Sequence, residues 1–143
     1  MDIKIRYTWR RKSDGAIDQE AITIEQLEGE GSRPYILTKK WADGWELVAR
    51  DLWSGLQDRN KVDIYNNDIG EVVDQEGKTV RFLVKWGTHR REMKSGWTVD
   101  IPGFCFEVNG FPTFPIANNY LNGHDLDIIS IIGSIHTTHE LLK

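Results

Sequence analysis

Residues 62–86, VDIYNNDIGEVVDQEGKTVRFLVKW, indicate the fold most clearly. Three apolar runs, at residues 62–65, 69–73 and 79–86, are separated by short polar segments. In the last run the apolar side chains recur at every second position, which is the period of a β-strand. These side chains are Val80, Phe82, Val84 and Trp86. Strands joined by short polar turns predict an antiparallel meander or a small barrel-like sheet.

The same pattern continues on both sides of this segment. Residues 3–9 alternate without a break and predict a half-buried strand with Tyr7 and Trp9 on its inner face. Residues 21–24 are compatible with a short strand or with entry into a helical turn that reaches Leu27. Further strands are expected at residues 35–37, 45–49, 97–99 and 104–108, with a closing strand at 126–132 and a short C-terminal helical turn at 138–142.

Composition agrees with a sheet. The chain has 143 residues, the size of one ordinary domain, and it contains six Trp, five Phe and four Tyr. Aromatic side chains suit the half-buried surface of a sheet. We therefore predict a mostly β domain over residues 1–143, and we leave open a division into a β-rich lobe at 1–51 and a barrel-like lobe at 52–143.

Cysteine content, the first residues and charge indicate the cellular compartment in which the protein is expected. A single cysteine, Cys105, excludes an intramolecular disulfide, and the first residues lack the apolar stretch of a secretory signal. No window approaches the ~20 apolar residues that cross a bilayer. The formal net charge is −4, which does not favour a surface covered by nucleic acid. The expectation is a cytoplasmic protein that does not enter a membrane.

Residues 54–69, SGLQDRNKVDIYNNDI, resemble the signature of the YopX family of phage and prophage proteins, which runs roughly TGLKDKNGKEIYEGDIV. The shared positions are Gly55, Leu56, Asp58, Asn60, Ile64, Tyr65, Asp68 and Ile69. Residues 5–9, 82–86 and 132–142 are also similar to family segments, whereas residues 10–50 and 87–125 carry no motif that aligns. The resemblance implies a β-rich fold, a phage or prophage origin in a bacterial host cytoplasm, and self-association; it implies no reaction.

The signature consists of turn residues and core aliphatics. Asp58, Asn60, Asn67 and Asp68 have short side chains that can bond nearby backbone amides. The carboxylates of Asp63, Asp68, Glu71 and Asp74 are expected to be solvated turn residues. The family has glycine at the two turn positions that are Lys61 and Asn67 here. Asn tolerates a positive φ, but Lys does so less readily. We therefore expect a different type of turn at Lys61.

No catalytic or cofactor-binding group emerges from the sequence, and we predict a non-enzymatic protein. His136 and His139 are spaced three apart, with His124, Asp125 and Asp127 upstream, but a zinc site needs three or four ligands at defined distances. Exposed polar residues are the favoured interpretation of this pair. Cys105 lies between Phe104 and Phe106, and we expect it to be buried in a strand rather than nucleophilic.

Two binding functions remain open. Basic and aromatic residues are interleaved twice, as in single-strand nucleic-acid grooves: Arg10 and Arg11 follow Trp9, and His89, Arg90, Arg91 and Lys94 lie between Trp86 and Trp97. The acidic net charge opposes this hypothesis, as does the alternation that points Trp9 and Trp86 toward the core. We favour self-association as a homo-oligomer, together with binding of a phage or host protein.

Overall fold

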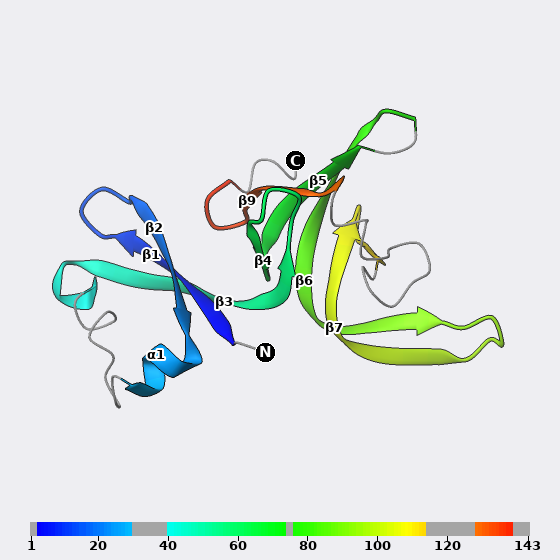
Figure 1. The fold of residues 1–143 in the computed structure, drawn as a ribbon, viewed down its shortest axis with the longest axis horizontal. Coiled ribbons are helices and arrows are strands. Elements are labelled where there is room, and N and C mark those ends of the chain that lie inside the picture. Colours follow the sequence, from blue (N-terminus) through cyan, green and yellow to red (C-terminus); the bar gives the residue numbers. More distant parts are fainter. Residues whose placement is uncertain (1–2, 30–39, 74–75, 114–127, 139–143) are drawn as a thin grey trace. The chain divides into compact units, whose positions relative to one another are not determined.

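The computed structural model describes residues 3–29, 40–73, 76–113 and 128–138 (Figure 1). The chain forms two compact units, Met1–Gly55 and Leu56–Lys143. The protein is mostly β, as predicted, and the strands pair in two antiparallel sheets with the orders β2-β1-β3-β4 and β8-β7-β6-β5-β9. No described helix is long and apolar enough to cross a membrane.

In the first unit, β1 (Lys4–Arg11) lies between β2 (Ile17–Thr23) and β3 (Trp45–Gln57). The alternation of β1 places Tyr7 and Trp9 in a core with Ile22, as expected. Helix α1 (Ile24–Gly29) follows β2 directly. Thr23 and Gln26 exchange backbone-to-side-chain hydrogen bonds of 2.8 and 3.2 Å, a capping box that starts the helix. The strand and the helical turn expected near residue 24 therefore both form, one after the other.

The second unit contains the segment that indicated the fold. Its strands are β4 (Asp63–Tyr65), β5 (Asp68–Val73), β6 (Thr79–Glu92), β7 (Thr98–Val108), β8 (Phe111–Thr113) and β9 (Ser130–Ser134). The core contains Ile64, Phe82, Val84, Phe106 and Ile129. Phe82 and Phe106 stack with their centroids 4.5 Å apart. Gly70 makes room for this ring pair, because a Cβ there would lie 2.3 Å from Cζ of Phe82.

The meander is confirmed, since β5, β6, β7 and β8 are neighbours in chain order. The barrel is not: within the described residues the sheet is open, and β9 joins it beside β5 instead of closing it. The closing strand was also misplaced, because β9 spans Ser130–Ser134 and not 126–132. The strand expected at 35–37 and most of the helical turn at 138–142 lie outside the described residues.

A second difference concerns the length of the central strands. The sequence predicted a strand ending at Trp86 and two separate strands at 97–99 and 104–108. Instead, β6 continues to Glu92, and the two later strands are one, β7, which pairs with β6 over ten consecutive residue pairs from Leu83 opposite Glu107 to Glu92 opposite Thr98. The basic segment after Trp86 is therefore a strand and not a loop, so its residues have a fixed register.

Candidate interaction site

In the second unit, polar side chains of the signature segment hydrogen-bond to backbone amides. Asp58 is 4% exposed, and its Oδ1 accepts hydrogen bonds from the amides of Asn60 (2.8 Å) and Val62 (3.0 Å). Its Oδ2 accepts a third from the amide of Ile131, at 2.9 Å. One carboxylate thus shapes the turn before β4 and fastens it to β9. All these contacts are structural, and they leave the Asp58 oxygens directed at the protein's own backbone.

The turn at Lys61 does not differ in the way expected. Lys61 has a φ of 64° and Asn67 a φ of 69°, so both residues are left-handed. The expectation for Lys61 was wrong because Asp58 holds the amides on both sides of it, and the Lys61 amide itself donates to the Asp58 carbonyl oxygen at 3.1 Å. These contacts offset the steric penalty of a left-handed Lys.

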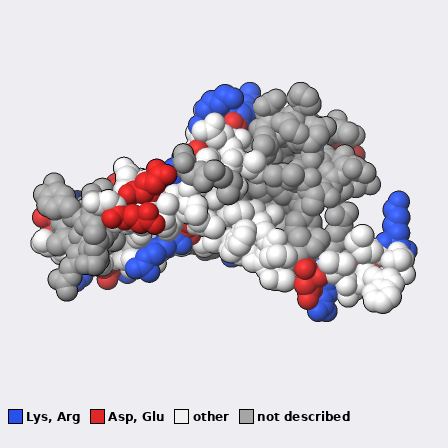
Figure 2. Space-filling model, turned by 60° about the horizontal axis from the view of Figure 1, so that its bottom comes forward, with Lys and Arg blue, Asp and Glu red and all other residues white. Residues whose placement is uncertain are grey.

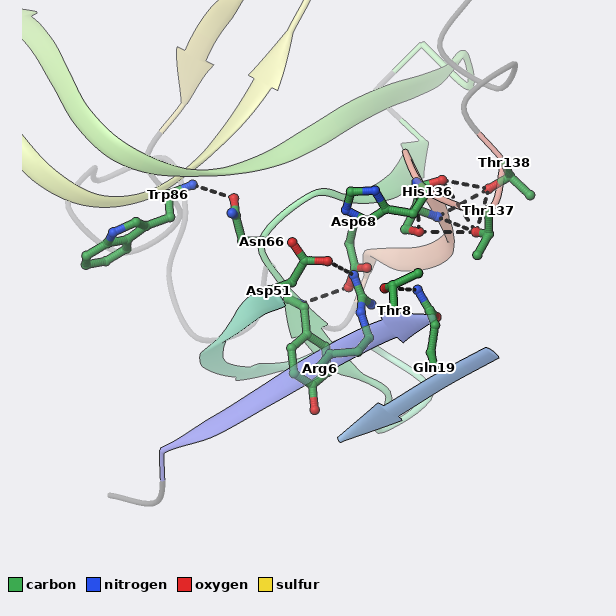
Figure 3. A network of polar contacts seen from close by, with 12 residues as sticks. Arg6, Thr8, Gln19, Asp51, Asn66, Asp68, Trp86, His136, Thr137 and Thr138 are labelled. Atoms are coloured by element: carbon green, nitrogen blue, oxygen red, sulfur yellow. Dashed lines mark hydrogen bonds and ion pairs between the residues drawn. The ribbon is translucent and has the colours of Figure 1, made fainter. Parts of the chain in front are cut away.

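Asp68 is also not the solvated carboxylate that we expected. It is 1% exposed, and its Oδ2 accepts a hydrogen bond of 2.8 Å from the Tyr65 amide. The neighbouring Asn66 and Asn67 contact β6. The Asn67 amide donates to the Val84 carbonyl oxygen at 2.8 Å. Asn66 Oδ1 accepts from the Trp86 amide at 2.8 Å (Figure 3). This turn therefore covers the outer side of β6 as far as Trp86.

The hypothesis of a zinc site at His136 and His139 stays a prediction. The His136 amide donates to Ser134 Oγ at 3.3 Å, beside Thr137 and Thr138, whose hydroxyls surround the end of β9 (Figure 3). His139, His124, Asp125 and Asp127 lie outside the described residues. Within the described ranges, no three His, Cys, Asp or Glu residues are grouped so that they could hold a metal ion.

Cys105 is buried, as predicted, with 0% of its surface exposed. Desolvation in this position raises the pKa of the Cys105 thiol to about 11, with a further increase from the nearby carboxylate of Glu107. A thiol with so high a pKa has almost no thiolate at neutral pH, and the thiolate is the nucleophilic form.

Three of the candidate nucleic-acid contacts are engaged with carboxylates. Arg10 Nε lies 2.7 Å from Glu46, Arg11 donates two hydrogen bonds to Asp14, at 2.9 and 2.6 Å, and Arg90 Nε lies 3.2 Å from Asp100. The hydrogen bond from Arg11, with another from the Ala16 amide, lowers the pKa of Asp14 to about 2. In Figure 2, Lys and Arg atoms occur in small separate groups, some directly beside Asp and Glu atoms.

The remaining candidates lie in or next to β6. The backbone register places His89 opposite Ile101 and Arg91 opposite Val99, and Lys94 is exposed in the turn that follows. Residues 86–103 contain three Lys or Arg and two Asp or Glu, so their formal charge is close to neutral. The structure thus brings His89, Arg90, Arg91 and Lys94 together on one hairpin, while Arg10 and Arg11 belong to the other unit.

The two tryptophans expected in the core behave differently. Trp9 is fully buried, which confirms the expectation, but Trp86 is 50% exposed. Alternation does place Trp86 on the same face as Phe82 and Val84, and it packs against Phe104 with centroids 4.8 Å apart. Among the described residues the buried cluster ends at this point, however, so Trp86 stays half exposed.

Beyond Trp86 the two strands continue as a ribbon, which we name the β6–β7 arm and define as residues 87–103. Figure 1 shows β6 and β7 curving together away from the other strands of their sheet. The arm begins where Gly87 lies opposite Gly103, whose φ of 147° few other residues adopt. Three of its apolar side chains are exposed: Met93 at 44%, Trp97 at 75% and Val99 at 42%.

Sequence reasoning missed this arm because its strands are polar. The segment Thr88–Glu92 has no apolar residue, so it shows no alternation of apolar and polar side chains from which a strand could be predicted. A usable signal was the Ser95-Gly96 pair, a turn signature, with Gly96 at a φ of 89°. It stands midway between Trp86 and Phe104, as the turn of one long hairpin would.

No protein-family model matches the chain, and no curated protein matches it at a significant level.

Proposed function

We propose that this chain is a non-enzymatic binding protein that associates with itself through the β6–β7 arm. The observation that carries the proposal is the exposure of Met93, Trp97 and Val99 on a two-stranded ribbon. A ribbon of two strands has no second layer to bury these side chains, and clustered exposed apolar surface on a folded protein marks an interface. Trp is moreover the residue type most enriched among the energetic anchors of interfaces.

Nucleic-acid binding is the second candidate, and one observation favours it. Trp86 and Trp97 are both accessible, and Arg90, Arg91 and Lys94 lie on the same hairpin, so cations and rings occur together. Against it, the Arg90 guanidinium already has a carboxylate partner in Asp100, and the arm carries almost no net charge. Without a field that attracts phosphates, self-association is the better supported of the two.

The proposal includes a YopX-like origin, hence a phage or prophage protein in a bacterial cytoplasm that also binds a phage or host protein. Support comes from the two turn positions at which the family has glycine. Both Lys61 and Asn67 are left-handed, which is the backbone conformation that a glycine at those positions would serve. The open meander is compatible with this assignment.

Light scattering coupled to size-exclusion chromatography tests the proposal. We expect the wild-type protein to be an oligomer at micromolar to millimolar concentration, and Trp97→Ser to weaken association by about tenfold or more, as loss of an interface anchor does. Val73→Ser is the matched control, because Val73 is an exposed apolar strand residue outside the arm (59%). A wild-type protein that is monomeric throughout this range would refute self-association.

A mobility-shift titration with single- and double-stranded DNA tests the alternative. Under the proposed function, no salt-dependent shift occurs at micromolar protein. A shift that weakens with salt and is lost in the double variant Arg90→Ala, Arg91→Ala would make nucleic-acid binding the preferred function.

A further inference from the structure

The two outer edges of the β6–β7 arm are chemically different. In an antiparallel pair, the backbone groups of successive residues point alternately toward the partner strand and away from it. The Met93 amide donates to Trp97 across the arm, at 2.7 Å, whereas the Val84 carbonyl and the Trp86 amide bond to Asn67 and Asn66 on the other side. The even-numbered residues of β6 therefore direct their amides and carbonyls outward.

The register carries this alternation to the end of the arm. Pairing of β6 with β7 is continuous from Leu83 to Glu92, so Thr88, Arg90 and Glu92 present their backbone groups at the outer edge. On β7 the residues opposite them are Pro102, Asp100 and Thr98. These three residues direct their backbone groups to the other outer edge.

Pro102 protects the β7 edge. Its nitrogen carries no hydrogen, so a strand that approached this edge would find no donor at Pro102 and would meet the ring instead. Proline at an outward position is one of the devices that keep sheet edges from pairing.

The β6 edge lacks such protection. The turn at Asn66 and Asn67 covers it only as far as Trp86, and no described residue bonds to the outer groups of Thr88, Arg90 and Glu92. As far as the described residues go, the outward backbone donors and acceptors of these three residues are unpaired, so this side of the arm can accept one more strand.

We infer that the open edge of the arm pairs with the same edge of a second copy of this chain, as two antiparallel β6 strands related by a twofold axis at Arg91. This inference rests on the proposed self-association and specifies its geometry. A strand that pairs with itself in the antiparallel direction forms an isologous contact, the form that most homodimers use.

Charge selects the register. With the axis at Arg91, Arg90 lies opposite Glu92 of the partner subunit, and the same contact occurs twice by symmetry. This axis also pairs the two Arg91 residues, which is one like-charge contact against two contacts of opposite charge. An axis at Arg90 or at Glu92 instead gives a like-charge contact on the axis and no contact of opposite charge. Opposite charges across a strand pair stabilise it, and like charges destabilise it. In the selected register, Arg90 lies between Asp100 of its own β7, already 3.2 Å away, and Glu92 of the partner subunit.

A pair of proline variants tests which edge is used. Arg90→Pro and Asp100→Pro each remove one member of the Arg90–Asp100 ion pair, and each places proline where the amide points outward and makes no bond inside the arm. The two variants therefore affect the arm itself alike. We expect Arg90→Pro to weaken dimerisation by at least about tenfold, since it removes a backbone donor and an ion pair, while Asp100→Pro still dimerises.

Cross-linking tests the position of the axis. Residues opposite each other in an antiparallel pair have Cβ atoms about 4.5–5.5 Å apart, close enough for a disulfide after small adjustment. We expect Arg91→Cys to form a covalent dimer under mild oxidation. Val99→Cys, at the opposite position of β7, should not do so. The native Cys105 is buried and does not interfere.

The position of the axis also predicts a substitution that strengthens dimerisation. It places Arg91 against Arg91 of the partner subunit, so Arg91→Thr removes a like-charge pair and is expected to tighten the dimer by up to about fivefold.

The outcomes separate this inference from the proposed function. If the wild-type protein is a monomer, both fail. If it is an oligomer that Arg90→Pro leaves unchanged, or that Arg90→Pro and Asp100→Pro weaken equally, self-association stands and the β6 edge is refuted. Faster cross-linking of Val99→Cys than of Arg91→Cys would also refute it. Circular dichroism of each variant verifies that the sheet is retained, and the cross-linking result stands even if a proline variant fails to fold.

Discussion

The two halves of the β6–β7 hairpin are paired in the same way and are stabilised differently. Near the sheet, Val84 and Phe106 are buried in the core, and their strands are one part of a layer. In the arm the same two strands continue in register, but Met93, Trp97 and Val99 are exposed. Both halves thus have the same backbone pairing, but only the half near the sheet has side chains buried in the core described above. Backbone pairing therefore determines the shape of the whole hairpin, whereas side-chain burial determines which half of the hairpin stabilises the fold.

Truncating one apolar side chain in each half tests this difference most strongly. Phe106→Ala removes a ring stacked on Phe82 in the core and is expected to lower the free energy of unfolding by about 3–5 kcal/mol. Val99→Ala, in the arm, is expected to change it by less than about 0.5 kcal/mol. Urea unfolding of dilute, monomeric protein followed by circular dichroism gives both values, and equal losses would show that the arm is buried within the monomer.

The reactivity of a cysteine in each half of the hairpin reports how accessible that half is to a reagent in solution. Cys105 has a pKa of about 11, whereas an exposed cysteine in Val99→Cys has an ordinary pKa near 8.5. At pH 7.5 the thiolate fractions alone differ on the order of a hundredfold, and burial slows Cys105 further. Reaction with a coloured disulfide reagent should give one fast thiol in Val99→Cys and none in the native wild-type protein. Rapid labelling of Cys105 without denaturant would contradict its burial.

The junction between the halves gives a smaller effect. Gly103→Ala introduces a Cβ that would have no atom within 4 Å, so any loss comes from its φ of 147°. We expect a loss of about 1–3 kcal/mol. Gly29→Ala is the control, because Gly29 is equally open and has no positive φ. Thermal unfolding compares the two, and a neutral Gly103→Ala would mean that the arm can straighten without penalty.

The smallest effect is expected at the ion pair of the arm. Arg90 and Asp100 are 73% and 57% exposed, so water and salt screen their attraction. Asp100→Asn should lower the free energy of unfolding by less than about 1 kcal/mol, and the difference should vanish in 1 M salt. A larger, salt-resistant loss would indicate that the pair is desolvated in an assembly.

Sequence patterns predicted the parts of the fold that are buried on one face. The strands around Trp9 and Phe82 were predicted because one face of each is apolar, and alternation reports nothing else. The arm was missed because no face of residues 88–92 is apolar, and only its partner β7 makes it a strand. Its pairing depends on residues of β7 that approach only after the chain has turned, which local patterns do not reveal.

The same reason explains the errors at single residues. Trp86 was expected in the core because alternation gives the face of a strand but not the point at which the core ends. Lys61 was expected to avoid a left-handed turn because residue preference ignores Asp58, whose hydrogen bonds decide the local conformation. Of the candidate site, the sequence identified the cluster of basic and aromatic residues, but not the carboxylates that neutralise it or the ribbon that exposes its rings.

The carboxylate of Asp58 has a consequence for synthesis of the chain on the ribosome. One of its oxygens bonds to the amide of Ile131, which lies 73 residues further along. During translation the meander of β5 to β7 emerges first, and Asp58 and the outer side of β5 stay hydrated until β9 has left the exit tunnel. Because so distant a contact closes slowly, the second unit is expected to reach its native state only after β9 has emerged, and a nascent chain stalled before Ile131 should be readily degraded by proteases.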